Sequence, residues 1–383
     1  MIQPPATLGM LGGGQLGRYF VIAAQQLGYR VMVLDPDRNS PAARIADLHI
    51  AAPYDDREAL SRMAKSCAAI TTEFESVPAE TLAYLAAFVP VQPSAEALSI
   101  CQQRSAEKNF LKRHAFPHVP YADIRSESDV SNVSSDLFPG ILKVVRFGYD
   151  GKGQVRVNDK EACLSAFRRL EGEPCVLEKQ MALESELSIV LTRSVSGEIK
   201  RFPVAENHHR HGILDYSVVS GPGAANELSV EVAAIAEKIA VSMDYVGTLS
   251  VEFFVVDGQL YVNEMAPRPH NSGHFTLDAC LTNQFEQQVR ALCGLPLGDP
   301  ATHSAAVMVN LLGELWFSGN PERACEPDWG KLLAHPGLTL HLYGKHEARP
   351  GRKMGHFTVL GESFEKPYLT AMAARAAIGI SDS

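Results

Sequence analysis

Residues 7–18, TLGMLGGGQLGR, have the pattern of a strand, a tight turn and the start of a helix. The apolar run at 8–11 predicts a buried strand, and the apolar spacing of the following VIAAQQL predicts a helix. The intervening GGGQLG matches the dinucleotide-binding pattern GxGxxG, in which a helix N-terminus offers N–H groups to an anion. Asp35 closes the next apolar run, near where an acidic residue would hold a ribose. The pattern fits a nicotinamide enzyme, another anion-binding turn or a purely structural turn.

The alternation of apolar runs and helical patterns continues to about residue 93, through RVMVL, AAITTEF and FVPVQP. This rhythm is typical of an open, mostly parallel α/β sheet. A polar helical stretch follows, and then a series of strands separated by Gly-containing turns, which predicts antiparallel sheets. The last segment, with AVMVNLLG and LTLHLYG, indicates a small β-rich unit that ends in a helix. We therefore predict three domains, at residues 1–97, 98–300 and 301–383.

The composition is that of an ordinary globular protein, with 46% hydrophobic and 21% charged residues among 383. A formal net charge of -9 argues against a nucleic acid or an anionic membrane as partner, because no basic field attracts either. The seven cysteines form no CxxC pair and predict reduced thiols. No signal sequence and no run of about 18 apolar residues is visible, so we predict a cytoplasmic protein.

A glycine-rich segment, GYDGKGQ at 148–154, lies between the predicted strands GILKVV and QVRV. Its three glycines allow backbone N–H groups to approach phosphate oxygens, with Lys152 as a point charge. Lys143, on the preceding strand, adds a second cation within reach of a nucleotide. The alternative is a plain glycine-rich hairpin, and the P-loop pattern GxxxxGK[ST] is absent.

Two carboxylates, Glu252 and Glu264, flank the Asp-Gly turn of LSVEFFVVDGQLYVNEM. A two-residue loop would pair Glu252 with Asn263 and turn Glu264 to the other face. A three-residue loop would pair Glu252 with Val262, which makes Glu264 a diagonal neighbour on the same face and turns the Asn263 side chain away. Two carboxylates on one face can hold Mg²⁺ bound to nucleotide phosphates. The alternative is a solvated pair on an outer face.

Polar side chains are dense in two later loops. MAPRPHNSGHFT, directly after Glu264, brings Arg, His, Asn and Ser side chains together, which suits a small anion and its negatively charged transition state. KHEARPGRKMGH at 345–356 contains cations around a turn, which suits the binding of a substrate phosphate. The alternative is a solvent-exposed charged surface that increases solubility, which is the more common role of a run of charged residues.

Taken together, these motifs resemble the ATP-grasp superfamily. NEMAPRPHNSGH and ARPGRKMGH resemble its 5-(carboxyamino)imidazole ribonucleotide synthase family, over nearly the whole chain. The resemblance implies a Rossmann-like N-terminal domain, a central ATP-grasp domain that clamps the nucleotide between two sheets, and a small β-rich C-terminal domain. It implies ATP, Mg²⁺, bicarbonate and 5-aminoimidazole ribonucleotide as reactants, carboxyphosphate as intermediate and a homodimer of purine biosynthesis. The amine would receive its carboxyl group from carboxyphosphate or from carbon dioxide trapped beside it.

The resemblance also implies the site residues. The nucleotide site would consist of Arg104, Lys143, Gly148, Tyr149, Asp150, Gly151, Lys152, Gly153, Gln154, Glu178, Lys179, Gln180, Met181, Glu186, His209, Asn263 and Glu264. The metal ligands would be Glu252 and Glu264. The catalytic residues would be Arg268, His270, Asn271 and Ser272 at the bicarbonate, with Lys345. The ribonucleotide would contact Gln15, Glu73, Tyr149, Asp150, Lys345 and Arg352, so that GGGQLG serves the substrate and no nicotinamide is needed.

One departure affects ENHHRHGIL, where the family usually has an acidic or amide residue at the position of His211. Which of His208, His209 and His211 faces the nucleotide is therefore open. Three rival functions also stay open: a sister ATP-grasp ligase such as formate-dependent glycinamide ribonucleotide transformylase or biotin carboxylase, a nicotinamide oxidoreductase, and a catalytically silent nucleotide-binding module.

Overall fold

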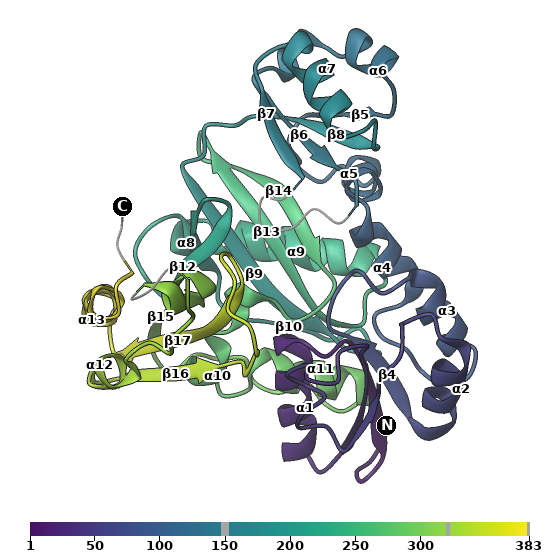
Figure 1. The fold of residues 1–383 in the computed structure, drawn as a ribbon, viewed down its shortest axis with the longest axis vertical. Coiled ribbons are helices and arrows are strands. Elements are labelled where there is room, and N and C mark those ends of the chain that lie inside the picture. The colour runs from purple at the N-terminus through teal and green to yellow at the C-terminus, as the bar shows by residue number, and fades with distance from the viewer. Residues whose placement is uncertain (147–152, 319–321, 381–383) are drawn as a thin grey trace.

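The computed structural model describes residues 1–146, 153–318 and 322–380, which contain three β-sheets (Figure 1). A small sheet lies at one end of the molecule, a large sheet occupies its centre, and a parallel sheet formed by the N-terminal residues lies at the other end (Figure 1).

The N-terminal unit has a parallel sheet, as the sequence predicts, and its strand order is β3-β2-β1-β4. The predicted run FVPVQP contributes only a bridge between Val91 and Ile70 of β4, and LHI, at the opposite edge of the sheet, is a strand that the sequence did not predict. The strands are β1 (Thr7–Leu11), β2 (Arg30–Leu34), β3 (Leu48–Ile50) and β4 (Ala69–Thr72), and the helices are α1 (Gln15–Gln26), α2 (Arg57–Ser66), α3 (Ala79–Ala86) and α4 (Ala95–Gln102).

Two glycines are required where β1 leads into α1: Gly12 in the turn and Gly17 in the first turn of the helix. Gly12 has a φ of 109°, a region that favours glycine. A Cβ on Gly17 would lie 2.8 Å from the carbonyl oxygen of Gly12. The turn can therefore close tightly only with glycine at both positions.

The small sheet is antiparallel, with the order β5-β8-β6-β7. Helices α6 and α7 cover one face, where Val130 and Phe167 pack against Leu142 and Leu177 of the sheet (Figure 1). The opposite face is left for the site. Its elements are β5 (Tyr121–Ile124), β6 (Gly140–Val144), β7 (Gln154–Val157), β8 (Cys175–Lys179), α6 (Glu127–Asn132) and α7 (Lys160–Arg169).

The large sheet has nine antiparallel strands, and β15, β17 and β16 from the last third of the chain continue it rather than form a sheet of their own. The strand β12, ILDYSVV, is absent from the sequence prediction. The strands are β9 (Ser185–Arg193), β10 (Ile199–Arg201), β11 (Ala205–Arg210), β12 (Ile213–Val219), β13 (Gly247–Val256), β14 (Gln259–Ala266), β15 (Ala305–Leu312), β16 (Leu338–Leu342) and β17 (Lys353–Gly361).

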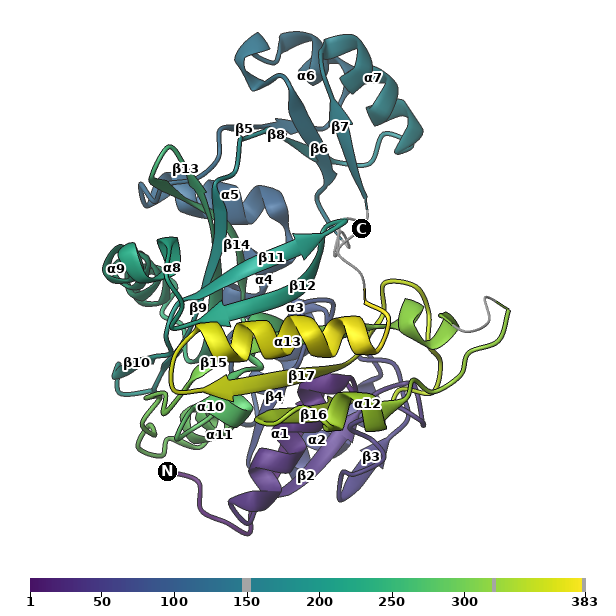
Figure 2. The ribbon, with the colours of Figure 1, turned by 90° about the vertical axis from the view of Figure 1, so that its left-hand side faces the viewer.

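Helices pack against this sheet and join it to the N-terminal unit. Helix α13 runs along β15 and β17 (Figure 2). In α11 the buried Gln288 accepts a hydrogen bond from the Thr248 N–H at 2.6 Å and donates one to the Thr71 hydroxyl at 2.8 Å, so it bridges the two sheets. The remaining helices are α5 (Arg104–Arg113), α8 (Ala224–Glu227), α9 (Ser229–Ser242), α10 (Thr276–Ala279), α11 (Gln284–Cys293), α12 (Trp329–Leu333) and α13 (Glu365–Ala377), with 3-10 turns at Ser135–Leu137, Asn271–Gly273 and Gly313–Phe317.

A search of the described residues finds no helix with both the length and the apolar character that a membrane crossing requires.

Candidate active site

A cleft of about 570 Å³ lies between the small sheet and the large sheet. Its walls come from β6 and β8 on one side and from β13 and β14 on the other. Most of the predicted nucleotide, metal and bicarbonate residues line it: Arg104, Lys143, Gln154, Glu178, Lys179, Gln180, Met181, Glu186, His209, Glu252, Asn263, Glu264, Arg268, His270 and Asn271.

The glycine-rich loop is described only at its end. Gly153 has a φ of 69° and precedes Gln154, which lines the cleft. The predicted positions Gly148, Tyr149, Asp150, Gly151 and Lys152 lie outside the described residues.

Glu252 and Glu264 lie directly opposite each other on β13 and β14. The hairpin has the two-residue loop at Asp257 and Gly258, and the pairing from Val256 to Phe253 follows that register. A β-bulge then adds one residue to β14, Asn263, which brings Glu264 opposite Glu252. Each predicted register was therefore wrong at this point, because neither included a bulge.

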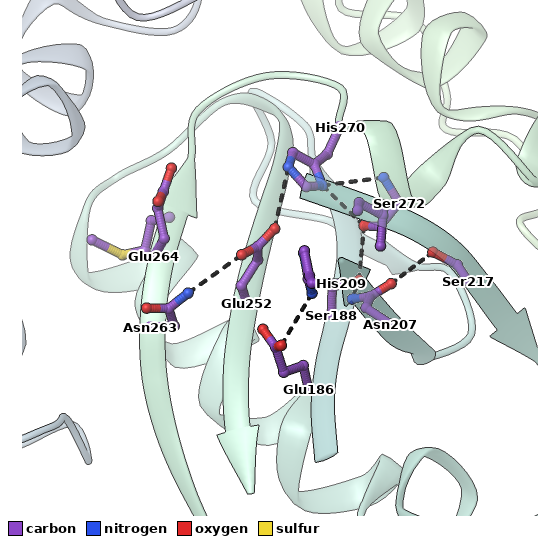
Figure 3. A network of polar contacts seen from close by, with 12 residues as sticks. Glu186, Ser188, Asn207, His209, Ser217, Glu252, Asn263, Glu264, His270 and Ser272 are labelled. Carbon is purple, nitrogen blue, oxygen red and sulfur yellow. Dashed lines mark hydrogen bonds and ion pairs between the residues drawn. The ribbon is translucent and has the colours of Figure 1, made fainter. Parts of the chain in front are cut away.

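The bulge also decides where Asn263 points. Its amide Nδ2 lies 3.4 Å from Glu252 Oε2, within the cleft (Figure 3). The prediction that the Asn263 side chain turns away was wrong, because two successive residues of a bulge oppose a single residue on the partner strand.

The paired carboxylates have the chemistry of a site for a hard cation. Burial and the neighbouring Glu264 raise the pKa of Glu252 to about 7. Ionisation of both carboxylates at once therefore costs free energy. Arg104 lies 3.7 Å from Glu264 and offsets part of this charge. A divalent cation would relieve the remaining repulsion, and the oxygen ligands present suit Mg²⁺.

A buried charge cluster forms the small-sheet side of the cleft. Lys143 Nζ lies 2.6 Å from Glu178 Oε2, and Lys108 Nζ lies 3.4 Å from Glu178 Oε1. Burial alone would raise the pKa of Glu178, but the two lysines lower it to about 2. Lys143 is thus held at the wall of the cleft by a carboxylate that stays ionised.

Helix α5 connects this cluster to the bulge on the opposite wall. Lys108 Nζ donates a hydrogen bond to the carbonyl oxygen of Asn263 at 3.1 Å, and Glu107 Oε1 accepts one from the Met265 N–H at 2.5 Å. Both side chains are buried. The sequence interpretation did not include Glu107 or Lys108, and no motif marks them.

The loop after β14 brings its polar groups to the same end of the cleft. His270 Nε2 lies 3.3 Å from Glu252 Oε1 (Figure 3). Arg268 Nε lies 2.7 Å from Glu75 Oε1. Burial and Arg268 lower the pKa of His270 well below its ordinary value, so the ring is neutral. Both polar atoms of the Asn271 side chain are buried without a hydrogen-bond partner among the described residues. Such an amide at the wall of a cleft is prepared for a polar ligand.

Ser272 differs from Arg268, His270 and Asn271, the other residues predicted at the bicarbonate. Its side chain is buried behind the cleft, where its hydroxyl contacts His270 Nδ1 at 2.9 Å and accepts a hydrogen bond from Ser188 at 2.7 Å. Ser272 is therefore placed to support His270 and is absent from the lining of the cleft.

Of the three candidate histidines, His209 lines the cleft. A bulge between His208 and His209 interrupts the pairing of β11 with β12. His209 Nδ1 consequently lies 3.2 Å from Glu186 Oε1. His208 stacks on Tyr216 with a centroid distance of 4.3 Å, and His211 occupies a turn with a φ of 53°.

The predicted ribonucleotide residues that the structure describes do not line this cleft. Glu73 is buried and accepts hydrogen bonds from the N–H groups of Gly14 and Gly17, while Asp35 accepts one from Gly13 at 2.7 Å. The turn thus already carries two carboxylates of the protein. This arrangement occupies the N–H groups and the acidic residue that a dinucleotide would need.

Three further ribonucleotide residues among those the structure describes come from α1 and from the segment before β17. Gln15 is the first residue of α1. Lys345 Nζ donates to the carbonyl oxygen of Lys353 at 2.6 Å and interacts electrostatically with Glu73. Arg352 donates to the carbonyl oxygen of Glu347 at 2.7 Å.

Comparison with known protein families assigns most of the chain. The ribonucleotide synthetase preATP-grasp domain matches residues 5–102, the ATP-grasp domain residues 109–285, and the phosphoribosylaminoimidazole carboxylase C-terminal domain residues 306–367. The N5-carboxyaminoimidazole ribonucleotide synthase of Bacillus subtilis (strain 168) is 41% identical over 363 residues, which cover 94% of this chain and 93% of that protein.

The chain belongs to the N5-carboxyaminoimidazole ribonucleotide synthase family. The family resemblance of the sequence motifs is thereby confirmed, and so is the prediction of an ATP-dependent ligase with an ATP-grasp fold.

Solved structures of the N5-carboxyaminoimidazole ribonucleotide synthase family agree with this assignment. An ADP complex of an N5-carboxyaminoimidazole ribonucleotide synthetase matches with a TM-score of 0.90 and 40% identity, and the match covers 98% of this chain and 97% of that one. The Aspergillus clavatus enzyme in complex with ADP and 5-aminoimidazole ribonucleotide matches with a TM-score of 0.86 and 28% identity, over 97% of this chain and 98% of that one.

Lys353 lines the cleft, although the sequence interpretation assigned only its neighbours Lys345 and Arg352. It is the one lining residue from β15 or beyond within the described parts of the chain. Its charge acts on Glu252 and on His270, which lie at the same end of the cleft. The signal was present in the basic run RPGRK, but a run of cations does not show which one faces inward.

Proposed function

We propose that this chain carries out the reaction of its family on the residues described above. ATP activates bicarbonate, and the carboxyl group is transferred to the amino group of 5-aminoimidazole ribonucleotide. The products are 5-(carboxyamino)imidazole ribonucleotide, ADP and phosphate, in de novo purine biosynthesis. The cytoplasmic location and the homodimer remain predictions from the sequence.

ATP binds in the cleft between the two sheets in this proposal. Lys143 faces its phosphates, and residues 178–181 hold the base, with Glu186 and His209 nearby. The support is that these side chains line one cleft together with the Glu252 and Glu264 pair.

Glu252 and Glu264 would hold Mg²⁺, with Asn263 beside them. The support is the direct opposition of the two carboxylates and the raised pKa of Glu252, which is caused first by burial and then by the negative charge of Glu264. The cation would neutralise charge on the phosphates of bound ATP.

The first chemical step joins bicarbonate to phosphorus. A bicarbonate oxygen attacks the γ-phosphorus of ATP, the bond from that phosphorus to the β–γ bridging oxygen breaks, and ADP leaves with the electron pair. Arg268 and Asn271 would orient bicarbonate, while the neutral His270 donates a hydrogen bond to the developing anion. Lys353 would add a positive charge at the same place.

The second step forms the carbon–nitrogen bond. The amine nitrogen attacks the carboxyl carbon, the bond from that carbon to the phosphate oxygen breaks, inorganic phosphate leaves, and the nitrogen gives up a proton. The carbon comes from carboxyphosphate itself or from carbon dioxide that it has released. Gln15, Glu73, Lys345 and Arg352, with Tyr149 and Asp150 outside the described residues, would hold the ribonucleotide.

The main observation in support of this proposal is that Glu252 and Glu264 lie opposite each other, with His270 in contact with Glu252. Release of ADP in bicarbonate, with and without 5-aminoimidazole ribonucleotide, tests it. We expect release that depends on the ribonucleotide. Equal or faster release with glycinamide ribonucleotide and formate, or with biotin, would instead assign the chain to a sister ligase.

A further inference from the structure

A chain of buried hydrogen bonds leads from the interior of the large sheet to His270 (Figure 3). The Ser217 hydroxyl donates to Asn207 Oδ1 at 2.7 Å, and Asn207 Nδ2 donates to the Ser188 hydroxyl oxygen at 2.8 Å. Ser188 then donates to Ser272 at 2.7 Å, and Ser272 contacts His270 Nδ1 at 2.9 Å. We call Ser217, Asn207 and Ser188 the serine–asparagine relay.

The direction of each hydrogen bond between Asn207 and His270 follows from the amide group of Asn207. An amide NH₂ group can only donate, so the Ser188 oxygen accepts from Asn207 and its own hydrogen is available to Ser272. Ser272 accepts that hydrogen and turns its own toward His270 Nδ1. The relay thus delivers a donor to Nδ1.

The backbone points to the same state of the ring independently. The Ser272 N–H donates to His270 Nδ1 at 3.3 Å, which caps the 3-10 turn at Asn271–Gly273. An N–H group can only donate, so Nδ1 carries no hydrogen. A histidine ring that carries no hydrogen on Nδ1 carries its hydrogen on Nε2, which is the atom that faces Glu252 and the cleft.

The relay could be only a structural link between β9, β11 and β12. Three features favour a role at His270. Every member is buried, so each hydrogen bond is costly to leave unmade. The bonds run in a single direction, and the relay ends on the one ring nitrogen that must stay unprotonated if the other is to donate into the cleft.

We propose that Ser188, Asn207 and Ser217 are positioning residues that hold His270 as the Nε2–H tautomer, so that it presents a hydrogen-bond donor to the reacting anion. The part about the anion rests on the proposed function, whereas the tautomer does not.

Nitrogen-15 spectra of the full-length protein labelled at the histidine rings test the tautomer directly. The His270 signals are identified by their loss in His270→Gln. We expect an unprotonated Nδ1 and a protonated Nε2 in the unsubstituted protein. A protonated Nδ1 would overturn the proposal without the need for any relay variant, and it would leave the carboxylation reaction itself untouched.

Two relay variants test the connection. Ser188→Ala removes the donor to Ser272. Asn207→Asp replaces the amide by an acceptor, which draws the Ser188 hydrogen away from Ser272 and so reverses the relay. We expect both to introduce the Nδ1–H tautomer at His270 and to lower kcat by about 3- to 10-fold, the effect of one hydrogen bond. The KM for ATP should stay within about twofold.

Thr192→Val is the matched control. Thr192 lies on β9 with Ser188, is equally buried, and exchanges a hydrogen bond with Thr248 at 2.9 Å, but it makes no contact with His270. This variant should keep both the tautomer and kcat. If Ser188→Ala and Asn207→Asp behave as Thr192→Val does in the spectra and in kcat, the relay is only structural. Absence of bicarbonate-dependent ADP release in the unsubstituted protein would instead reject the proposed function.

Discussion

Glu252 and Glu264 face each other across β13 and β14 because Asn263 is an extra residue in β14. Without the bulge, the two-residue loop would place Glu264 on the opposite face of the sheet. The bulge therefore assembles the acidic pair, and Lys108 and Glu107 form hydrogen bonds with the backbone on either side of Glu264.

Glu264→Gln should abolish ATP turnover while the protein remains folded. A neutral amide cannot balance a divalent cation on the phosphates, so we expect ADP formation to fall by about 100-fold or more. ADP release across a Mg²⁺ titration measures this. Glu231→Gln, on the exposed side of α9, serves as the control and should titrate normally. Turnover of Glu264→Gln near the control level in saturating Mg²⁺ would contradict the metal assignment.

Lys108→Met should destabilise the protein by up to about 3–5 kcal/mol, because it leaves Glu178 buried with one cation fewer. Since Lys143 remains, we expect the lower part of that range. Urea denaturation gives the free energy of unfolding. Lys112→Met, at an exposed position of the same helix, should change it by less than about 0.5 kcal/mol.

The double variant Lys108→Met with Glu178→Gln refines this prediction. If the cost arises from the unpaired charge, removing the carboxylate should recover part of it, so the two changes will cost less together than their sum. Strict additivity would show that Lys108 contributes through packing alone.

Arg352→Ala should weaken the interaction with the ribonucleotide and spare ATP. A charge-assisted contact to phosphate is worth roughly 1.5–3 kcal/mol, which corresponds to about a 10- to 150-fold higher KM for the ribonucleotide. The KM for ATP should barely change, because Arg352 is not among the residues that line the cleft between the sheets. Steady-state kinetics with each substrate varied in turn separates the two effects. If only the KM for ATP rises, the basic segment at 345–356 contacts ATP, and our assignment of this segment to the ribonucleotide is wrong.

Three histidine rings stack where the N-terminal unit, the central sheet and the C-terminal strands meet. The centroids of His274 and His356 are 4.7 Å apart, and those of His341 and His356 are 4.5 Å apart. Burial lowers the pKa of His274 to about 3 and that of His356 well below its ordinary value. Both rings are therefore neutral in the folded protein and gain a proton on unfolding below about pH 6.5.

The contribution of these two histidines to the free energy of unfolding should consequently fall as the pH drops from about 6.5 toward 5. At each of them the unfolded state binds more protons in this window, which contributes up to about 1.4 kcal/mol per pH unit. Glu252 and Glu107, whose pKa values are raised to about 7 and about 8, contribute with the opposite sign, so the effect of His356 is measured by comparison with a variant. Urea denaturation at several pH values gives the slope. His356→Gln should reduce the slope by about one such contribution, and an unchanged slope would show that His356 is protonated in the folded state.

Local patterns in the sequence were sufficient for the elements that depend on neighbouring residues. The parallel N-terminal sheet could be predicted from apolar runs that alternate with segments of helical spacing. The tight turn after the first strand could be predicted from its glycines, because Gly12 and Gly17 approach each other too closely for a side chain. The family motifs located most of the side chains that line the cleft, because residues within one loop stay together whatever the rest of the chain does.

Only the tertiary structure decided how those segments meet. The continuation of the large sheet by β15 and the relay from Ser217 to His270 depend on contacts between strands that are distant in sequence. The bulge at Asn263 lies within one hairpin, but no residue pattern in the sequence marked it. Ser188 and Ser272 are 84 residues apart, and neither belongs to a pattern that names the other. Side-chain periodicity specifies which face of an element is apolar, but the register between two strands is decided by the packing of both. The sequence by itself therefore determined the family and the chemical inventory, whereas the fold alone determined which carboxylates oppose each other and which ring nitrogen faces the cleft.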